Sequence, residues 1–169
     1  MQKHHQYLKS GVLAKLTPEQ VQWVEQILAG THRATRIPDA DIQRYWAVYL
    51  SQQGDIPAFK IGYSGNVDAR NKMARTDNCA GAEFRVVKQW EFVDKKTAHR
   101  FEQELLDDRV LRKYRGGTNK RPTEWLVLQG ITRAQLTKHL VLSRIAYCVD
   151  SYLEVVEKRG NRNVYKYRE

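Results

Sequence analysis

The sequence predicts an α+β fold: a small, mainly antiparallel three-stranded sheet flanked by helices, with added N- and C-terminal helices. Two short apolar runs, 46–50 and 59–61, are separated by the polar stretch SQQGDIPA, whose glycine and proline favour chain reversal. These runs predict a hairpin. A third run, 85–93, contains β-branched and aromatic residues with partial alternation and predicts another strand. Apolar residues at helical spacing elsewhere predict the flanking helices.

Helix boundaries follow from capping patterns. The first helix is predicted to begin at Thr17, where the order Thr-Pro-Glu-Gln forms a capping box, and to end at Gly30. Asp94 is the predicted cap of a long second helix. The short apolar stretch TEWLVL predicts a last strand or extended piece. A final helix is predicted over residues 133–158, with an apolar stripe that suits either a crossing of the domain or a dimer contact.

Length and composition predict one compact domain of 169 residues. Three parts are expected within it: an N-terminal arm and helix (1–43), a core (44–129), and a C-terminal helix with a basic tail (130–169). Cys79 and Cys148 lie far apart without partners at metal-ligand spacing, so we expect reduced thiols. No signal peptide or apolar run of membrane length is visible, which predicts a cytoplasmic protein.

The charge balance favours a polyanionic partner. The formal net charge is +10 and the isoelectric point is about 9.7, and basic residues that meet phosphates release condensed counterions. A solvated basic surface would give the same composition. The tail RGNRNVYKYRE interleaves basic residues with tyrosines, which suits nucleic-acid contacts or a frayed terminus. A glycine-containing loop holds the basic residues Arg112, Lys113, Arg115, Lys120 and Arg121. This cluster suits contacts with a strand of nucleic acid, and an ordinary exposed loop is the alternative.

The predicted hairpin and the segment after it gather reactive side chains. Facing strands would bring Tyr49 close to Lys60, a phenol beside an amine. Gly62 would leave room for a ligand or for a close backbone contact. The pattern after SGN predicts a helix, and Arg70 would lie about one turn inside it, over the end of the hairpin.

These stretches resemble the motifs of the GIY-YIG nuclease superfamily. AVY stands where GIY would be, and KIG stands where YIG would be. Arg70 and Glu102 match the arginine and the glutamate of the family's later helices, and the closing EWL is also similar. The resemblance covers residues 44–128 and is to the branch with KIG in place of YIG, as in phage-encoded members and some restriction enzymes. AVY lacks the first glycine, and Lys60 replaces the second tyrosine.

The resemblance implies a GIY-YIG-like core over 44–129 and a metal-dependent DNA endonuclease activity. Its catalytic residues would be Tyr49, Lys60, Arg70 and Glu102. Glu102 would hold Mg²⁺ or Mn²⁺, which neutralises phosphate charge and assists the leaving group. Arg70 would donate to the scissile phosphate. Either Tyr49 or Lys60 would be the general base or its positioner, and the sequence does not divide that role.

Each of these residues also has a structural interpretation. Tyr49 can be a strand tyrosine of the core, Lys60 an exposed strand lysine, and Arg70 can form an ion pair with Glu102. A second hypothesis is a nucleic-acid-binding module on the same fold that has lost cleavage, as the missing glycine and second tyrosine of the motifs would indicate. A third hypothesis is an RNA-processing enzyme.

Three residues beside the second motif are predicted to contact substrate: Gly62, Tyr63 and Ser64. Tyr63 and Ser64 would either support a phosphate or cap the following helix, whereas Asn66 is the better cap. Because one active site cuts one strand at a time, a duplex cutter would need a homodimer, sequential nicks or repositioning. The C-terminal helix is the predicted dimer contact. If the protein is phage-encoded, its expected location is the host cytoplasm.

Overall fold

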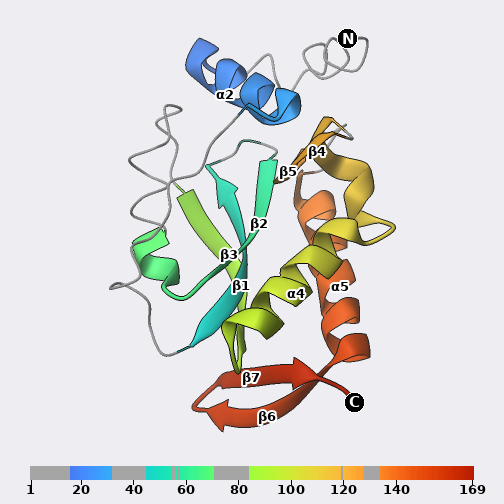
Figure 1. Ribbon diagram of the computed structural model, residues 1–169. Coiled ribbons are helices and arrows are strands. Elements are labelled where there is room, and N and C mark those ends of the chain that lie inside the picture. Colours follow the sequence, from blue (N-terminus) through green and yellow to red (C-terminus); the bar gives the residue numbers. More distant parts are fainter. Residues whose placement is uncertain are drawn as a thin grey trace.

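The computed structural model describes residues 16–31, 45–54, 56, 58–70, 84–118, 120–127 and 134–169 (Figure 1). A helical turn covers residues 67–70. The other elements, in chain order, are α2 (Pro18–Ala29), β1 (Trp46–Gln53), β2 (Ala58–Ser64), β3 (Phe84–Phe92), α4 (Lys95–Asp107), the 3-10 helix η3 (Leu111–Tyr114), β4 (Arg115–Thr118), β5 (Arg121–Val127), α5 (Ala134–Tyr152), β6 (Leu153–Arg159) and β7 (Arg162–Tyr167).

The strands form one seven-stranded mixed sheet in the order β4-β5-β2-β1-β3-β7-β6. The predicted three-stranded antiparallel sheet is therefore wrong in size and in pairing, although the α+β class agrees. The three predicted strands are its centre, because β1 pairs antiparallel with both β2 and β3. Strand β5 extends the sheet beside β2, and β7 extends it beside β3 in a parallel pair.

The predicted final helix, 133–158, is too long at its C-terminal end. Helix α5 ends at Tyr152, and the chain passes directly into the β6–β7 hairpin. Leu153 and Val156 fit helical spacing, which is why the sequence pattern extended the helix. The hairpin turn contains Gly160 at a φ of 59°, a left-handed conformation that glycine adopts without strain. The predicted basic tail is thus a strand of the sheet.

The predicted basic loop after α4 is also regular structure. It forms η3 and then β4, which pairs antiparallel with β5. Its sequence RGGT has neither apolar residues nor alternation, so the strand has no signal of its own and depends on pairing with β5.

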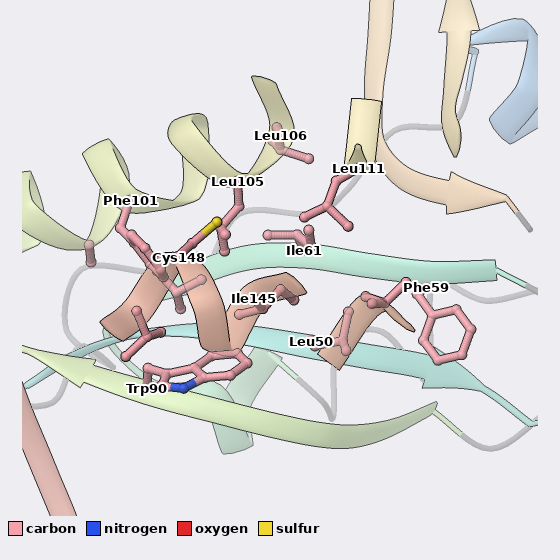
Figure 2. Packing of buried hydrophobic residues seen from close by; sticks show 14 of the residues in the cluster. Leu50, Phe59, Ile61, Trp90, Phe101, Leu105, Leu106, Leu111, Ile145 and Cys148 are labelled. Atoms are coloured by element: carbon pink, nitrogen blue, oxygen red, sulfur yellow. The ribbon is translucent and has the colours of Figure 1, made fainter. Parts of the chain in front are cut away.

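One face of the sheet is covered by α4 and α5. Alternate residues of the central strands, such as Leu50 and Ile61, point to this face and pack in a single cluster with Phe101 of α4 and Ile145 of α5 (Figure 2). We call it the α4-side cluster. Helix α4 begins at its predicted cap, where Thr97 N–H donates to the Asp94 carboxylate at 2.7 Å.

The opposite face packs against α2, which begins with the predicted capping box at Thr17 and ends at Gly30. Its residues Trp23 and Ile27 pack with Tyr49 of β1 and with Trp125 of β5. We call this group the α2-side cluster. Because side chains of a strand alternate between faces, Tyr49 lies on the α2 side while its neighbours Val48 and Leu50 lie on the α4 side.

Candidate functional site

Tyr49 lies directly across Gly62. The β1–β2 register pairs these two residues, and Lys60 pairs with Ser51. Tyr49 and Lys60 therefore do not face each other directly as predicted, although they lie on the same face of the sheet in neighbouring pairs. An ideal Cβ on Gly62 would lie 2.5 Å from the Tyr49 hydroxyl oxygen. Gly62 therefore serves a close contact, one of its two predicted uses. Tyr49 is 1% exposed and belongs to the α2-side cluster.

Lys60 is buried, which corrects its interpretation as an exposed strand lysine. Its Nζ lies 3.4 Å from a carboxylate oxygen of Glu124, with side-chain exposures of 7% and 46%. The Trp125 ring lies 5.9 Å from the same nitrogen. The β2–β5 ladder ends where Lys60 pairs with Trp125, and Glu124 is the next residue of β5. Because side chains alternate along a strand, Glu124 points to the α4 side. Its ion pair with Lys60 therefore forms at the end of the β2–β5 ladder.

Glu102 is buried on α4 and is 2% exposed. Burial, followed by the negative charge of Glu124, raises the pKa of its carboxyl to about 7. A hydrogen bond from the Gln103 amide at 2.9 Å and the charges of Lys60 and Arg115 act in the opposite direction. Glu102, Glu124 and Lys60 therefore form one electrostatically coupled group. Glu102 enters it from the α4 side of the sheet, whereas Tyr49 lies on the α2 side.

Arg70 ends the described part of the helical turn 67–70. Asn66 caps that turn as expected, because its side chain accepts from Ala69 N–H at 3.0 Å. The Ser64 hydroxyl accepts from Asn66 N–H at 3.0 Å and stabilises the approach to the turn. Val67 packs against the α2-side cluster, so the turn that carries Arg70 lies on the Tyr49 face of the sheet.

The other predicted substrate contacts divide into anchored and exposed residues. Arg115 Nε donates to the Thr123 carbonyl oxygen at 2.6 Å, which fixes the β4–β5 hairpin. Tyr63 points to the α4 side, where its ring lies 4.8 Å from the His99 ring. The side chain of Arg121 lies outside the described residues. The exposed basic residues of the predicted cluster are Arg112, Lys113 and Lys120.

The residues present fit a divalent cation held by few protein ligands. Among the described residues, no group of three or more His, Cys, Asp and Glu side chains has metal-binding geometry. Glu102 and Glu124 instead offer two carboxylates. Burial and then the charge of Glu124 raise the pKa of Glu102 and so disfavour its ionised form, which a bound cation would stabilise. Mg²⁺ commonly keeps several waters and takes one or two carboxylates, which suits this arrangement.

Glu124 is the functional candidate to which sequence reasoning gave no role. It appeared only within the closing EWL motif, and no spacing rule connects it to Lys60. The contact depends on the pairing of β5 with β2, which is set by long-range sheet assembly. Of the two cysteines, Cys148 is buried in the α4-side cluster, and Cys79 lies outside the described residues.

Comparison with known families gives the class of protein. A family model for the T5orf172 domain matches residues 45–146, more than half of the chain. That domain is phage-associated and falls in a group related to nucleases. The chain therefore belongs to the T5orf172 domain family. No curated protein and no solved structure matches it. None of the helices within the described ranges is long and apolar enough to cross a membrane.

Proposed function

We propose that this protein is a metal-dependent DNA endonuclease that hydrolyses phosphodiester bonds through a site of the GIY-YIG type. The observation that carries the proposal is the coupled group of Lys60, Glu124 and Glu102 at the edge of the sheet. Glu102 enters this group from the α4 side, whereas Tyr49 and the turn that carries Arg70 lie on the α2 side, so the proposed site would have to span that edge. Membership of a nuclease-related family and the net charge of +10 support the same class of activity.

Hydrolysis of a phosphodiester requires an activated water, compensation of charge on the phosphate, and stabilisation of the leaving oxygen. Glu102 would hold Mg²⁺ or Mn²⁺, with Glu124 as a second oxygen donor. When bound, the cation supplies Lewis-acid stabilisation to the phosphate and the leaving group. Arg70 would donate to a non-bridging phosphate oxygen, for which the fixed charge and fork geometry of guanidinium are suited.

The contact with Glu124 bears on the choice of general base. An adjacent carboxylate stabilises an ammonium group, so Lys60 would act as a cation that faces the phosphate. Tyr49 would then position or deprotonate the attacking water. The phenol lies against the Gly62 backbone, where rotation of the ring is restricted. Replacing Tyr49 with Phe removes the hydroxyl and keeps the packing of the ring.

A non-catalytic nucleic-acid-binding module is the second candidate. The observation that favours it is the burial of Tyr49, which is 1% exposed and packs in the α2-side cluster as a core tyrosine would. On this hypothesis the basic surface, including the exposed Arg112, Lys113 and Lys120, binds the phosphate backbone without cutting it.

Cleavage assays separate the two candidates. Wild-type protein and the Arg70→Ala and Tyr49→Phe variants would be incubated with supercoiled plasmid, linear duplex, branched DNA and RNA, in Mg²⁺, Mn²⁺ or EDTA. The nuclease proposal expects wild-type cleavage that requires a divalent cation and falls at least about a hundredfold in each variant. Binding without cleavage in every cation would establish the binding module. Cleavage of RNA alone would move the proposal to RNA processing.

Homodimerisation through α5 stays a prediction. Leu140 and Tyr147 are exposed on this helix, with 58% and 56% of their surface accessible. Sedimentation of the free protein and of its DNA complex would test whether one or two chains act on a duplex.

A further inference from the structure

The β6–β7 hairpin brings two guanidinium groups onto one carboxylate of β3. Arg159 Nη2 donates to one oxygen of Glu91 at 3.0 Å, and Arg162 Nη1 donates to the other at 3.1 Å. The Glu91 side chain is only 11% exposed, so it is an interior anchor. Arg159 Nε also lies 3.7 Å from a carboxylate oxygen of Glu157, so the more exposed guanidinium, that of Arg162, is the one open to a ligand. The Arg159 guanidinium also stacks on the Tyr45 ring, 3.0 Å from its centroid.

This group lies one row of the sheet away from Tyr49. Tyr49 pairs with Gly62 on one side and with Gln89 on the other. On the same face, the next row consists of Ala47 of β1 between Ser64 of β2 and Glu91 of β3. Strand β7 pairs in parallel with β3 at Glu91↔Val164, so the β6–β7 hairpin lies beside that row.

A hollow of about 160 Å³ lies above this second row. Its floor is formed by Ala47, Ser64, Gln89 and Glu91, and one wall is the helical turn 67–70. Arg159 and Arg162 of the hairpin also line it. In Figure 1, the hairpin lies across the lower end of β1 and β3, below the green helical turn that carries Arg70. The hollow therefore extends from Gln89, the strand partner of Tyr49, to the hairpin.

Charge is distributed unevenly around the hollow. The hairpin turn reads KRGNRN over residues 158–163 and contains no acidic residue. The Arg162 side chain is 68% exposed, and its contact with Glu91 uses only Nη1 of a group that carries five N–H donors. Asp68 lines the hollow from the helical turn. An anion would therefore be attracted to the hairpin side and repelled from the Asp68 side.

We propose that this hollow binds the sugar-phosphate backbone of the DNA strand next to the bond that is cut, and that Arg162, with Arg159, contacts its phosphate. Glu91 is the positioning residue that holds both guanidiniums in place. The inference rests on the proposed nuclease function. It extends the substrate site to a hairpin beyond residues 45–146, the part matched by the family model.

The test compares two charge-equivalent substitutions in the same strand, β7. Arg162→Gln removes the proposed phosphate contact, whereas Lys166→Gln removes one positive charge from a lysine that pairs with Glu154 at 3.0 Å. Binding of a short fluorescent duplex would be measured by anisotropy in EDTA over a series of salt concentrations. Thermal unfolding of each variant would show that the hairpin is retained. Arg162→Lys serves as the second variant, because it keeps the charge without the fork geometry.

We expect Arg162→Gln to raise the Kd about tenfold and to reduce the slope of log Kd against log salt by about one. Lys166→Gln should raise the Kd less than about twofold, and Arg162→Lys should fall between Arg162→Gln and the wild type. If the two glutamine variants lose affinity equally, this inference is overturned while the proposed function stands. If the wild type neither binds nor cuts DNA, the proposed function is overturned and the inference with it.

Discussion

The ammonium nitrogen of Lys60 lies 3.4 Å from a carboxylate oxygen of Glu124, in an ion pair with one buried and one half-exposed partner. Lys60 comes from the central strand β2, and Glu124 comes from β5, which joins the sheet beside it. Glu102 of α4 is coupled electrostatically to both. Three charged groups from separate parts of the chain thus influence one another, and substitution of any one should be detected at the others.

Glu124→Gln should lower the free energy of unfolding by about 1–2 kcal/mol, because it leaves a buried ammonium group with a weaker partner. The matched control is Glu154→Gln. Glu154 is 44% exposed, similar to the 46% of Glu124, but its partner Lys166 is 40% exposed. The control should cost about 0.5 kcal/mol or less, as is usual for surface pairs. Urea denaturation measures both, and equal losses would mean that Lys60 is not buried as described.

Gly62→Ala should destabilise the protein by about 1–3 kcal/mol through overpacking. The new Cβ would lie 2.5 Å from the Tyr49 hydroxyl oxygen and 2.7 Å from its ring carbon Cζ, so the ring must move. The control Gly160→Asn lies in open space at a φ of 59°, which asparagine tolerates. Combining Gly62→Ala with Tyr49→Leu should recover part of the loss. A Gly62→Ala variant as stable as wild type would disprove the close contact.

The stability of the protein should depend on the ionisation of Glu102. Its pKa is raised from 4.5 to about 7, mainly by burial and then by Glu124, so between these values the folded state binds more protons than the unfolded chain. The free energy of unfolding contributed by this group therefore falls as the pH rises through that window, by up to about 3 kcal/mol. Denaturation of wild type and Glu102→Gln at several pH values isolates the effect. Parallel curves for the two proteins would contradict it.

Divalent cations should bind more tightly as the pH rises from 6 to 8, because the carboxylate that binds metal must lose its proton and Glu102 does so near pH 7. Calorimetric titration with Mn²⁺ measures this directly. Glu102→Gln should abolish the binding of the cation. The bound cation should stabilise the folded protein, and the chelator EDTA should reverse that stabilisation. Asp107→Asn, on the same helix with a side chain that is 75% exposed, should bind as wild type does. Unchanged binding by Glu102→Gln would exclude Glu102 as the ligand.

The central part of the fold could be predicted from local sequence signals. The hairpin of β1 and β2, the strand β3 and the caps at Thr17 and Asp94 follow from alternation and capping, and each is present. Strand β4 could not be predicted, because its residues RGGT carry no pattern and pair only when β5 is in place. Helix was predicted for the start of the C-terminal hairpin because Leu153 and Val156 lie three residues apart, which fits the helical period.

The candidate site was predictable only as a set of residue types. Motif positions selected Tyr49, Lys60 and Glu102, but spacing along the chain could not indicate that Lys60 is buried or that Glu124 pairs with it. Those facts depend on the register between β2 and β5, which is set by contacts far apart in sequence. The same limit applies to Arg162, which reaches Glu91 only because β7 adds parallel to β3.

The most direct test of the central claim is the single-turnover rate of DNA nicking by Glu102→Gln and by Asp107→Asn, measured in Mg²⁺ with the DNA fully bound. The proposed site predicts that Glu102→Gln loses at least about a thousandfold in rate while its affinity for DNA in EDTA is unchanged, and that Asp107→Asn cuts as the wild type does. Nicking by Glu102→Gln at the wild-type rate would contradict a cleavage site built on this carboxylate.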